Sequence, residues 1–230
     1  MSYLWNEFNI KTFRAETIVY RNGAFCPELS TLPAPDIQAA FDLPIHIIYV
    51  GEIAGPKSLK INIPFPDQRV FLTVKIKNKK PAFLNILIKN TGKNSEIHGG
   101  VLWENEASGT IDVAATHGAP NTTIFVQTKL IAGPNTQSKL SGTAIIEPDC
   151  PDCASDISFH ALAADSAQIE CRPAQRIQSA PAKADHAASL YHPRAPQIQY
   201  LRTAGLSTAE INDVLRQAFA DDFAPHYPEK

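Results

Sequence analysis

Apolar and polar side chains alternate through the middle of the chain. In Val70–Lys77, every second residue from Leu72 to Ile76 is apolar and the residues between them are polar. This period of two predicts a half-buried β-strand. A short apolar run predicts another strand at Ile45–Val50. The pattern predicts further strands at Leu84–Lys89, Ile97–Trp103, Thr110–Ala115, Thr122–Ile131, Lys139–Ile146, Asp156–Ala163 and Ala167–Cys171.

The spacing of these strands, roughly every 11–17 residues, is typical of a mainly β protein. Two architectures share this spacing: a two-sheet β-sandwich and a parallel β-helix, in which each coil stacks on the preceding one. Several of the later strands are rich in Ala, Thr and Ser, which suits closely stacked coils. Periodicity alone does not choose between the two, and on pattern alone the sandwich is slightly favoured.

Helical periodicity is confined to the C-terminal end of the chain. Gln197–Ala204 predicts a short helix that ends at Gly205, and Ser207 with Glu210 has the spacing of a capping box. An apolar stripe follows along the second helix, and a hairpin of this size cannot bury it alone. The stripe consists of Ile211, Val214, Leu215, Ala218 and Phe219. It either packs on the β part or binds a partner.

Composition narrows the fold and function classes further. Proline outnumbers glycine, 18 to 11, which favours short elements with fixed corners over long helices. A hydrophobic fraction of 44% is enough for a packed core and excludes disorder of the whole chain. With 21 basic and 23 acidic residues the chain is nearly neutral, so we expect neither nucleic acid nor a membrane surface as a partner. No apolar run predicts a signal peptide or a membrane span, so a cytoplasmic protein is expected.

The cysteines are candidate metal ligands. Cys150 and Cys153 form a C-x-x-C pair, and Cys171 follows after 17 intervening residues, a distance we interpret as close to one coil of a β-helix. Cys171 would then lie above the pair and complete a zinc or iron site, with His160 or His186 as fourth ligand. The alternative is a tight proline-containing turn with inert thiols, which is favoured because a second well-spaced ligand pair is missing.

The sequence gives little support for an enzyme. Nucleophile elbows, phosphate-binding loops and H-E-x-x-H motifs are all missing from it. We therefore expect a non-enzymatic protein with no tightly bound cofactor.

Two segments resemble the SufB/SufD family of iron–sulfur cluster assembly proteins. The first, Val19–Ser30 (VYRNGAFCPELS), is similar to a V-x-x-N-G-x-[FY]-x-P-E-L-S segment of that family. The second runs from Arg172 to Phe219 and is similar to the family's C-terminal end. Its matching positions are Pro173, Ile177, Ala184, His186, Ala188, Gln197, Ile198, Tyr200, Leu201, Gly205, Leu206, Ser207, Ala218 and Phe219.

This resemblance implies a right-handed parallel β-helix followed by a short helical segment. It divides the chain into a proline-rich lead-in with few strands (1–68), a β-helix core (69–190) and a helical docking segment (191–230). The segment would dock a SufC-like ATPase, and the core would pair with a SufB-like subunit or with a second copy. The implied docking residues are Gln197, Ile198, Tyr200, Leu201, Gly205, Ile211, Leu215 and Phe219.

For cluster chemistry, the resemblance implies a role for His186 at the subunit interface. A neutral imidazole nitrogen can ligate iron in a transient iron–sulfur cluster. Three positions depart from the family pattern: Arg176, Ala184 and Ala204. The chain is also shorter than full-length members and begins near the first motif, so a reduced, SufD-like scaffold subunit is expected. The alternative function is a stand-alone metal-binding β-domain that uses Cys150, Cys153 and Cys171.

Overall fold

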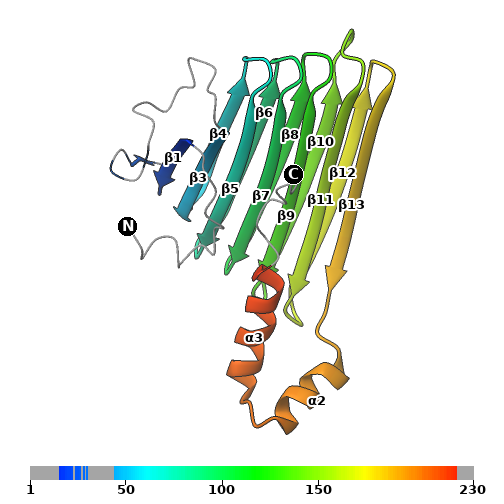
Figure 1. Ribbon diagram of the computed structural model, residues 1–230. Helices are drawn as coiled ribbons and strands as arrows, with labels where there is room; N and C mark the ends of the chain where they lie inside the picture. The colour runs from blue at the N-terminus through cyan, green and yellow to red at the C-terminus, as the bar shows by residue number, and fades with distance from the viewer. Residues whose placement is uncertain (1–15, 23, 27, 29, 31–43, 222–230) are drawn as a thin grey trace.

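Two parallel β-sheets make up most of the protein (Figure 1). The computed structural model describes residues 16–22, 24–26, 28, 30 and 44–221. One sheet has the strand order β13-β11-β9-β7-β5-β3-β1-β2, and the other has the order β12-β10-β8-β6-β4. From β3 onward, consecutive strands alternate between the sheets, so each coil of the chain adds one strand to each. The fold is therefore a parallel β-helix of about six turns.

The elements have the following bounds. The first sheet contains β1 (Glu16–Arg21), β2 (Ala24–Phe25), β3 (Ile45–Glu52), β5 (Arg69–Asn78), β7 (Glu96–Asn105), β9 (Thr123–Ala132), β11 (Cys153–Ala163) and β13 (Ala182–Tyr191). The second contains β4 (Gly55–Ile63), β6 (Ala82–Asn90), β8 (Gly109–His117), β10 (Gln137–Ile146) and β12 (Gln168–Ile177). Two helices follow, α2 (Ala195–Thr203) and α3 (Thr208–Asp221). No helix among the described residues is long and apolar enough to cross a membrane.

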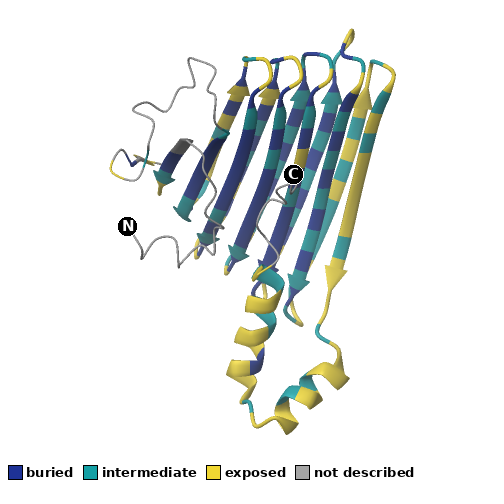
Figure 2. Ribbon diagram, viewed as in Figure 1, coloured by how far each residue is buried: buried dark blue, intermediate teal, exposed yellow. Residues whose placement is uncertain are grey.

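The strand register explains why a period of two is enough to build this core. Ile97 pairs with Val70 in the preceding coil and with Ile124 in the next one, and all three side chains are fully buried. Because side chains of paired residues on parallel strands lie on the same face, each inward position is stacked on the inward position of its neighbours. Figure 2 shows the buried positions alternating along the strands of the middle coils. Each fully buried Leu, Ile or Val contributes about 1.5–3 kcal/mol to folding.

The corners of the coils use asparagine and aspartate where glycine would be expected. Asp67, Asn94, Asn121 and Asp152 have φ values of 56° to 60°, at the turns where the chain passes from the second sheet to the first. Asn and Asp tolerate this left-handed conformation better than other non-glycine residues because their side chains bond to the local backbone. Because Asn and Asp occupy these left-handed corner positions, the protein needs few glycines there.

The parallel pairing excludes a β-sandwich of the antiparallel kind, and it also corrects the predicted start of the core. Strands β3 and β4 pair with β5 and β6, so the coils begin at Ile45 and the predicted boundary at residue 69 lies inside the solenoid. The apolar run predicted β3, which is buried on both faces at Ile45–Tyr49. The pattern did not predict β4, because β4 is a mostly exposed edge strand that carries Lys57 and Lys60.

The capping residues predict the end of the first helix and the start of the second. The Ser207 backbone N–H donates to the Glu210 carboxylate at 2.8 Å, and the Glu210 N–H donates to Ser207 Oγ at 3.3 Å, which confirms the capping box. Gly205 has φ of 89°, which fits its predicted place after the first helix. That helix starts two residues earlier than predicted because Pro196 is tolerated in its first turn.

Candidate functional site

The C-terminal end of the solenoid is open. Strands β12 and β13 are the last strands of their sheets, and each pairs with one neighbouring strand among the described residues. Figure 2 shows that exposed positions replace buried ones along both strands. Ile177, Leu190 and Tyr191 are 48–52% exposed, which is high for large apolar residues. An exposed strand edge of this kind is a template for pairing with another chain.

His186 and Cys171 face the interior side of this open coil. His186 pairs with the buried core residue Ile157, and Cys171 pairs with the buried core residue Leu140. Because the part of the chain that the structure describes adds no further coil over them, His186 is exposed and Cys171 is only half-buried. Burial against the core raises the pKa of the Cys171 thiol. The open end therefore presents an imidazole and a largely protonated thiol on its two last strands.

Charged groups gather on the outer face of β11 and β13, the last two strands of the first sheet. Asp156 and Asp185 are direct register partners and lie on the same face. Burial, followed by the carboxylate of Asp185, raises the pKa of Asp156, while His160 and His186 act in the opposite direction. His160 is itself held by a 2.6 Å hydrogen bond between Nδ1 and Ser189 Oγ.

The end of α3 packs on the outer face of the first sheet. Phe219 and Ala220 contact the buried residues Leu102 and Ile131 on β7 and β9. Lys129 donates from Nζ to the backbone carbonyl of Phe219 at 3.0 Å, and its ammonium lies 5.2 Å from the centre of the Phe219 ring. These contacts place the C-terminal turn of α3, but not its first turns, against the solenoid (Figure 1).

A second set of contacts joins α3 to neighbouring strands. Arg216 forms a 3.2 Å ion pair with Glu104 on β7. The Phe219 ring meets the ring of Tyr191, the last residue of β13, with centroids 5.8 Å apart in an edge-to-face arrangement. The helix thus contacts three strands of the first sheet.

These contacts bury some of the residues predicted to dock a partner and leave others exposed. Ile211 is 2% exposed and Phe219 packs on the sheet, so neither is free to bind a partner. Tyr200, by contrast, is 72% exposed, and Val214, a member of the predicted stripe, is 42% exposed.

The remaining predicted docking residues are structural or half-buried. Gln197 accepts the Arg194 N–H at 2.9 Å through its side-chain oxygen, which completes the start of α2. Gly205 ends that helix. Ile198, Leu201 and Leu215 are half-buried. The periodic stripe was thus a correct sign of an amphipathic helix, but part of it packs within the chain.

Cys150 lies in the turn between β10 and β11, and Cys153 is the first residue of β11. Both are buried, and they pack with Ile146 and the half-buried residues Ala182 and Ala184. The Cys153 thiol donates to the Ala119 carbonyl at 3.3 Å. Burial, with a smaller contribution from Cys153, raises the pKa of the Cys150 thiol. This geometry matches the proline-containing turn that the sequence favoured.

Cys171 does not lie above this pair, contrary to the predicted three-cysteine site. Its partner Leu140 precedes Ile146, the last residue of β10, by six positions, which corresponds to about 20 Å along a strand. The prediction failed because one coil contains two strands and is therefore longer than the interval from Cys153 to Cys171. The residue that lies above Ile146 in the next coil is Ile177, which comes after Cys171 in the chain. Among the described residues, no three His, Cys, Asp or Glu side chains are grouped in a way that could hold a metal ion.

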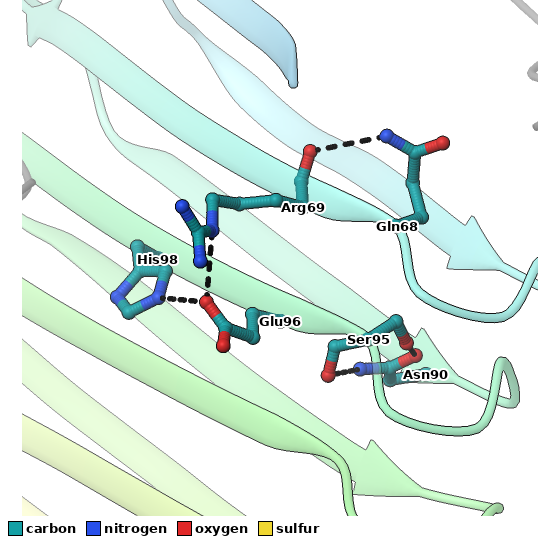
Figure 3. A network of polar contacts seen from close by, with 6 residues as sticks. All are labelled: Gln68, Arg69, Asn90, Ser95, Glu96 and His98. Atoms are coloured by element: carbon teal, nitrogen blue, oxygen red, sulfur yellow. Dashed lines mark hydrogen bonds and ion pairs between the residues drawn. The ribbon is translucent and has the colours of Figure 1, made fainter. Parts of the chain in front are cut away.

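Sequence reasoning missed a polar cluster on the outer face of β5 and β7 (Figure 3). Glu96 accepts a 3.0 Å ion-pair contact from Arg69 and lies 3.4 Å from His98 Nε2. The His98 ring stacks on Phe71 and meets Phe125 edge-to-face, and burial lowers the pKa of His98. The register that pairs Arg69 with Glu96 would have been needed to find this cluster, since the two residues are far apart in the sequence.

Comparison with protein families identifies the fold's relatives. The family model for the SufBD core domain of SUF-system FeS cluster assembly matches residues 77–219, more than half of the 230 residues. The match extends from the end of β5 to the end of α3, so it includes the open end and the helical hairpin. A search of curated proteins found no match. The chain belongs to the SufB/SufD family and has a role in iron–sulfur cluster assembly by the SUF system.

Proposed function

We propose that this chain is a non-enzymatic scaffold subunit of a SUF-type assembly complex. It pairs through the open end of its solenoid with a SufB-like subunit or with a second copy, and its helical hairpin docks a SufC-like ATPase. The iron–sulfur cluster is cargo that passes through the complex. The observation that carries this proposal is the open end formed by β12 and β13.

The open end supports pairing because its two strands combine unpaired edges with exposed apolar side chains. Ile177 and Leu190 each expose about half of their surface. At 25 cal/mol per Å², covering such side chains stabilises a complex by about 1 kcal/mol each. The free N–H and C=O groups along the edges add directional hydrogen bonds. A partner with a complementary strand edge satisfies both requirements.

His186 supports a role for this end in cluster assembly. Its imidazole is exposed on the interior side of the last coil, where a paired subunit would approach. A neutral ring nitrogen is a suitable iron ligand, whereas the imidazolium is not. In the proposed complex, His186 donates one ligand to a transient cluster and the partner supplies the others.

The hairpin supports ATPase docking through the side chains that its own packing leaves free. Tyr200 on α2 and Val214 on α3 are exposed, while the end of α3 is fixed on the solenoid. Tyr200 offers a large apolar ring with a polar tip, a residue type enriched at the energetic centres of interfaces. Anchoring at one end presents these residues without a large entropic loss on binding.

Co-purification tests each surface separately. The chain is co-expressed with the SufB-like and SufC-like subunits of the same cell and purified anaerobically, and the retained subunits, iron and sulfide are measured. Leu190→Arg is expected to lose the SufB-like subunit, and Tyr200→Ala to weaken ATPase retention at least tenfold. Phe83→Arg is the matched control, because Phe83 is similarly exposed but lies on β6, away from both surfaces.

His186→Ala distinguishes a cluster ligand from a packing residue. The variant is expected to retain both subunits but to carry much less iron and sulfide. Full cluster content in the His186→Ala complex would remove His186 from the proposal. Retention of both subunits by Leu190→Arg and Tyr200→Ala would refute the two docking surfaces.

A further inference from the structure

The last strand of the solenoid is held less firmly than those before it. Strand β13 pairs with β11 alone among the strands described, and most of its residues are exposed. By comparison, β11 pairs on both edges and buries every second residue. Local opening is easiest where buried apolar contacts are few, so β13 is the first part of the two sheets at this end expected to open.

Three side-chain contacts on the outer face support β13, and one of them joins the rings of Tyr191 and His160 of β11, whose centroids lie 6.5 Å apart. Ser189 is hydrogen-bonded to His160 of β11 at 2.6 Å. Tyr191 meets Phe219 of α3 with ring centroids 5.8 Å apart. The Tyr191–Phe219 contact is unlike the other two because it comes from outside the sheet. It makes the position of Tyr191, the final residue of β13, depend in part on whether the end of α3 is docked.

The end of α3 is in turn anchored on strands other than β13. Leu102 of β7 and Ile131 of β9 contact Phe219 and Ala220, and Lys129 bonds to the Phe219 carbonyl. Phe219 is therefore a fixed support against which Tyr191 rests.

Strand β13 is also joined to the helical hairpin directly through the chain, at the start of α2. Only residues 192–194 separate the end of β13 from the start of α2. Figure 1 shows the hairpin leaving the end of β13 and returning to the sheet through α3. A displacement of the hairpin therefore acts on β13 through this short connection and through the Tyr191–Phe219 contact.

We propose that the Tyr191–Phe219 contact couples the helical hairpin to the open end, so that a partner bound to one surface changes the affinity of the other surface for its partner. This inference rests on the proposed function, because it assigns a thermodynamic link to the same two surfaces. The two states are α3 docked with β13 ordered, and the end of α3 released with β13 loosened. Linkage requires the effect to be reciprocal: whatever an ATPase subunit does to the open end, a subunit at the open end does to the hairpin.

Hydrogen exchange of the full, isolated chain tests the link without any partner. Phe219→Ala is expected to speed exchange in β13 about three- to tenfold, the factor that corresponds to losing one aromatic pair. Tyr191→Ala is expected to speed exchange in the last turn of α3 by a similar factor. Tyr191→Phe keeps the ring and should leave both unchanged. Val214→Ala is the control on α3, because Val214 is exposed.

Strand β9 is the internal reference. Faster exchange in β9 would show that a variant is destabilised as a whole, and Phe219→Leu would then replace Phe219→Ala. The coupling is overturned if each alanine variant speeds exchange only in its own element. A second measurement adds the SufC-like ATPase to the wild-type chain. Binding that leaves exchange in β13 unchanged also overturns the coupling, whereas failure to bind, with the variant effects present, refutes the proposed function and leaves the link intact.

Discussion

Lys129 is expected to control how firmly α3 is docked on the solenoid. Its side chain is 6% exposed, on the outer face of β9, and its Nζ donates to the Phe219 carbonyl at 3.0 Å. No basic residue lies in the last turn of α3 itself, so Lys129 supplies a cation at the negative end of the helix dipole. The perturbation that isolates this role is Lys129→Met, which keeps the apolar stem and removes the ammonium.

The size of the effect follows from the contacts that are lost. A hydrogen bond to a charged donor contributes about 1.5–3 kcal/mol, and the cation near the Phe219 ring adds about 0.5–1 kcal/mol. Removing a buried ammonium also removes its desolvation cost, which offsets part of that loss. A net loss of about 1–2 kcal/mol in docking is expected, or a factor of about 5–30 in the ratio of docked to released helix.

Trypsin cleavage at Arg216 reports the released form. Arg216 lies in α3 and is paired with Glu104, so cleavage there requires local unfolding and its rate follows the population of the open state. Lys129→Met should raise the cleavage rate about 5–30-fold, while Lys139→Met on the opposite sheet should not. A rate at Arg216 within twofold of wild type would refute the assigned role of Lys129.

Three further predictions concern the strands and corners. Burial raises the pKa of Asp156 above its usual 3.8, so the folded state favours the protonated carboxyl. The protonated carboxyl therefore adds to stability at low pH, and this contribution is lost as pH rises through the folded pKa. Asp156→Asn should therefore raise the melting temperature at pH 7 but not at pH 3, and an equal shift at both would contradict this. Asn121→Val should lower stability by about 1–2 kcal/mol in urea unfolding because φ is 56° there, and Asn121→Gly should be nearly neutral. Cys153→Ala should lower the melting temperature while leaving the iron and zinc content of the isolated chain unchanged, and a stoichiometric metal lost in this variant would restore a cysteine metal site.

The alternation of side chains predicted most of the strands but could not choose between the two architectures. A period of two only states that one face of a strand is buried, and this is true in a sandwich and in a β-helix alike. The choice depends on register between residues such as Ile97 and Ile124, which periodicity does not contain. The family resemblance pointed to the β-helix, and the parallel register confirms a β-helix.

The strands that the pattern missed lie at the two ends of the solenoid. Strand β4 is an edge strand with Lys57 and Lys60. Charged residues on an edge strand prevent pairing with other chains, but they also interrupt the apolar alternation from which a strand is predicted. Strand β13 carries small residues such as Ala184 and Ala188 on its interior face, where no further coil requires a large side chain. End coils depart from the pattern because they are covered on one side only.

The candidate site was predicted less well than the fold, for two physical reasons. Cys171 was placed above Cys150 and Cys153 because a strand-to-strand interval was taken for a whole coil. Phe219 was assigned to a partner through the family resemblance, since the amphipathic stripe shows that a helix buries one face but not what covers that face. For His186, the strand register agrees with an exposed position at the open end, while its role in cluster assembly stays a prediction.

The most direct test of the scaffold assignment is hydrogen exchange across the whole chain before and after a SufB-like subunit is added. Protection is expected along β12 and β13, from residue 168 to residue 191, with little change in β4 and β6 at the other end of the solenoid. Addition of the SufC-like ATPase should protect α2 and the first turns of α3. Stable binding of the SufB-like subunit that protects other strands and leaves β12 and β13 exchanging at their original rates would contradict the assignment of the open end.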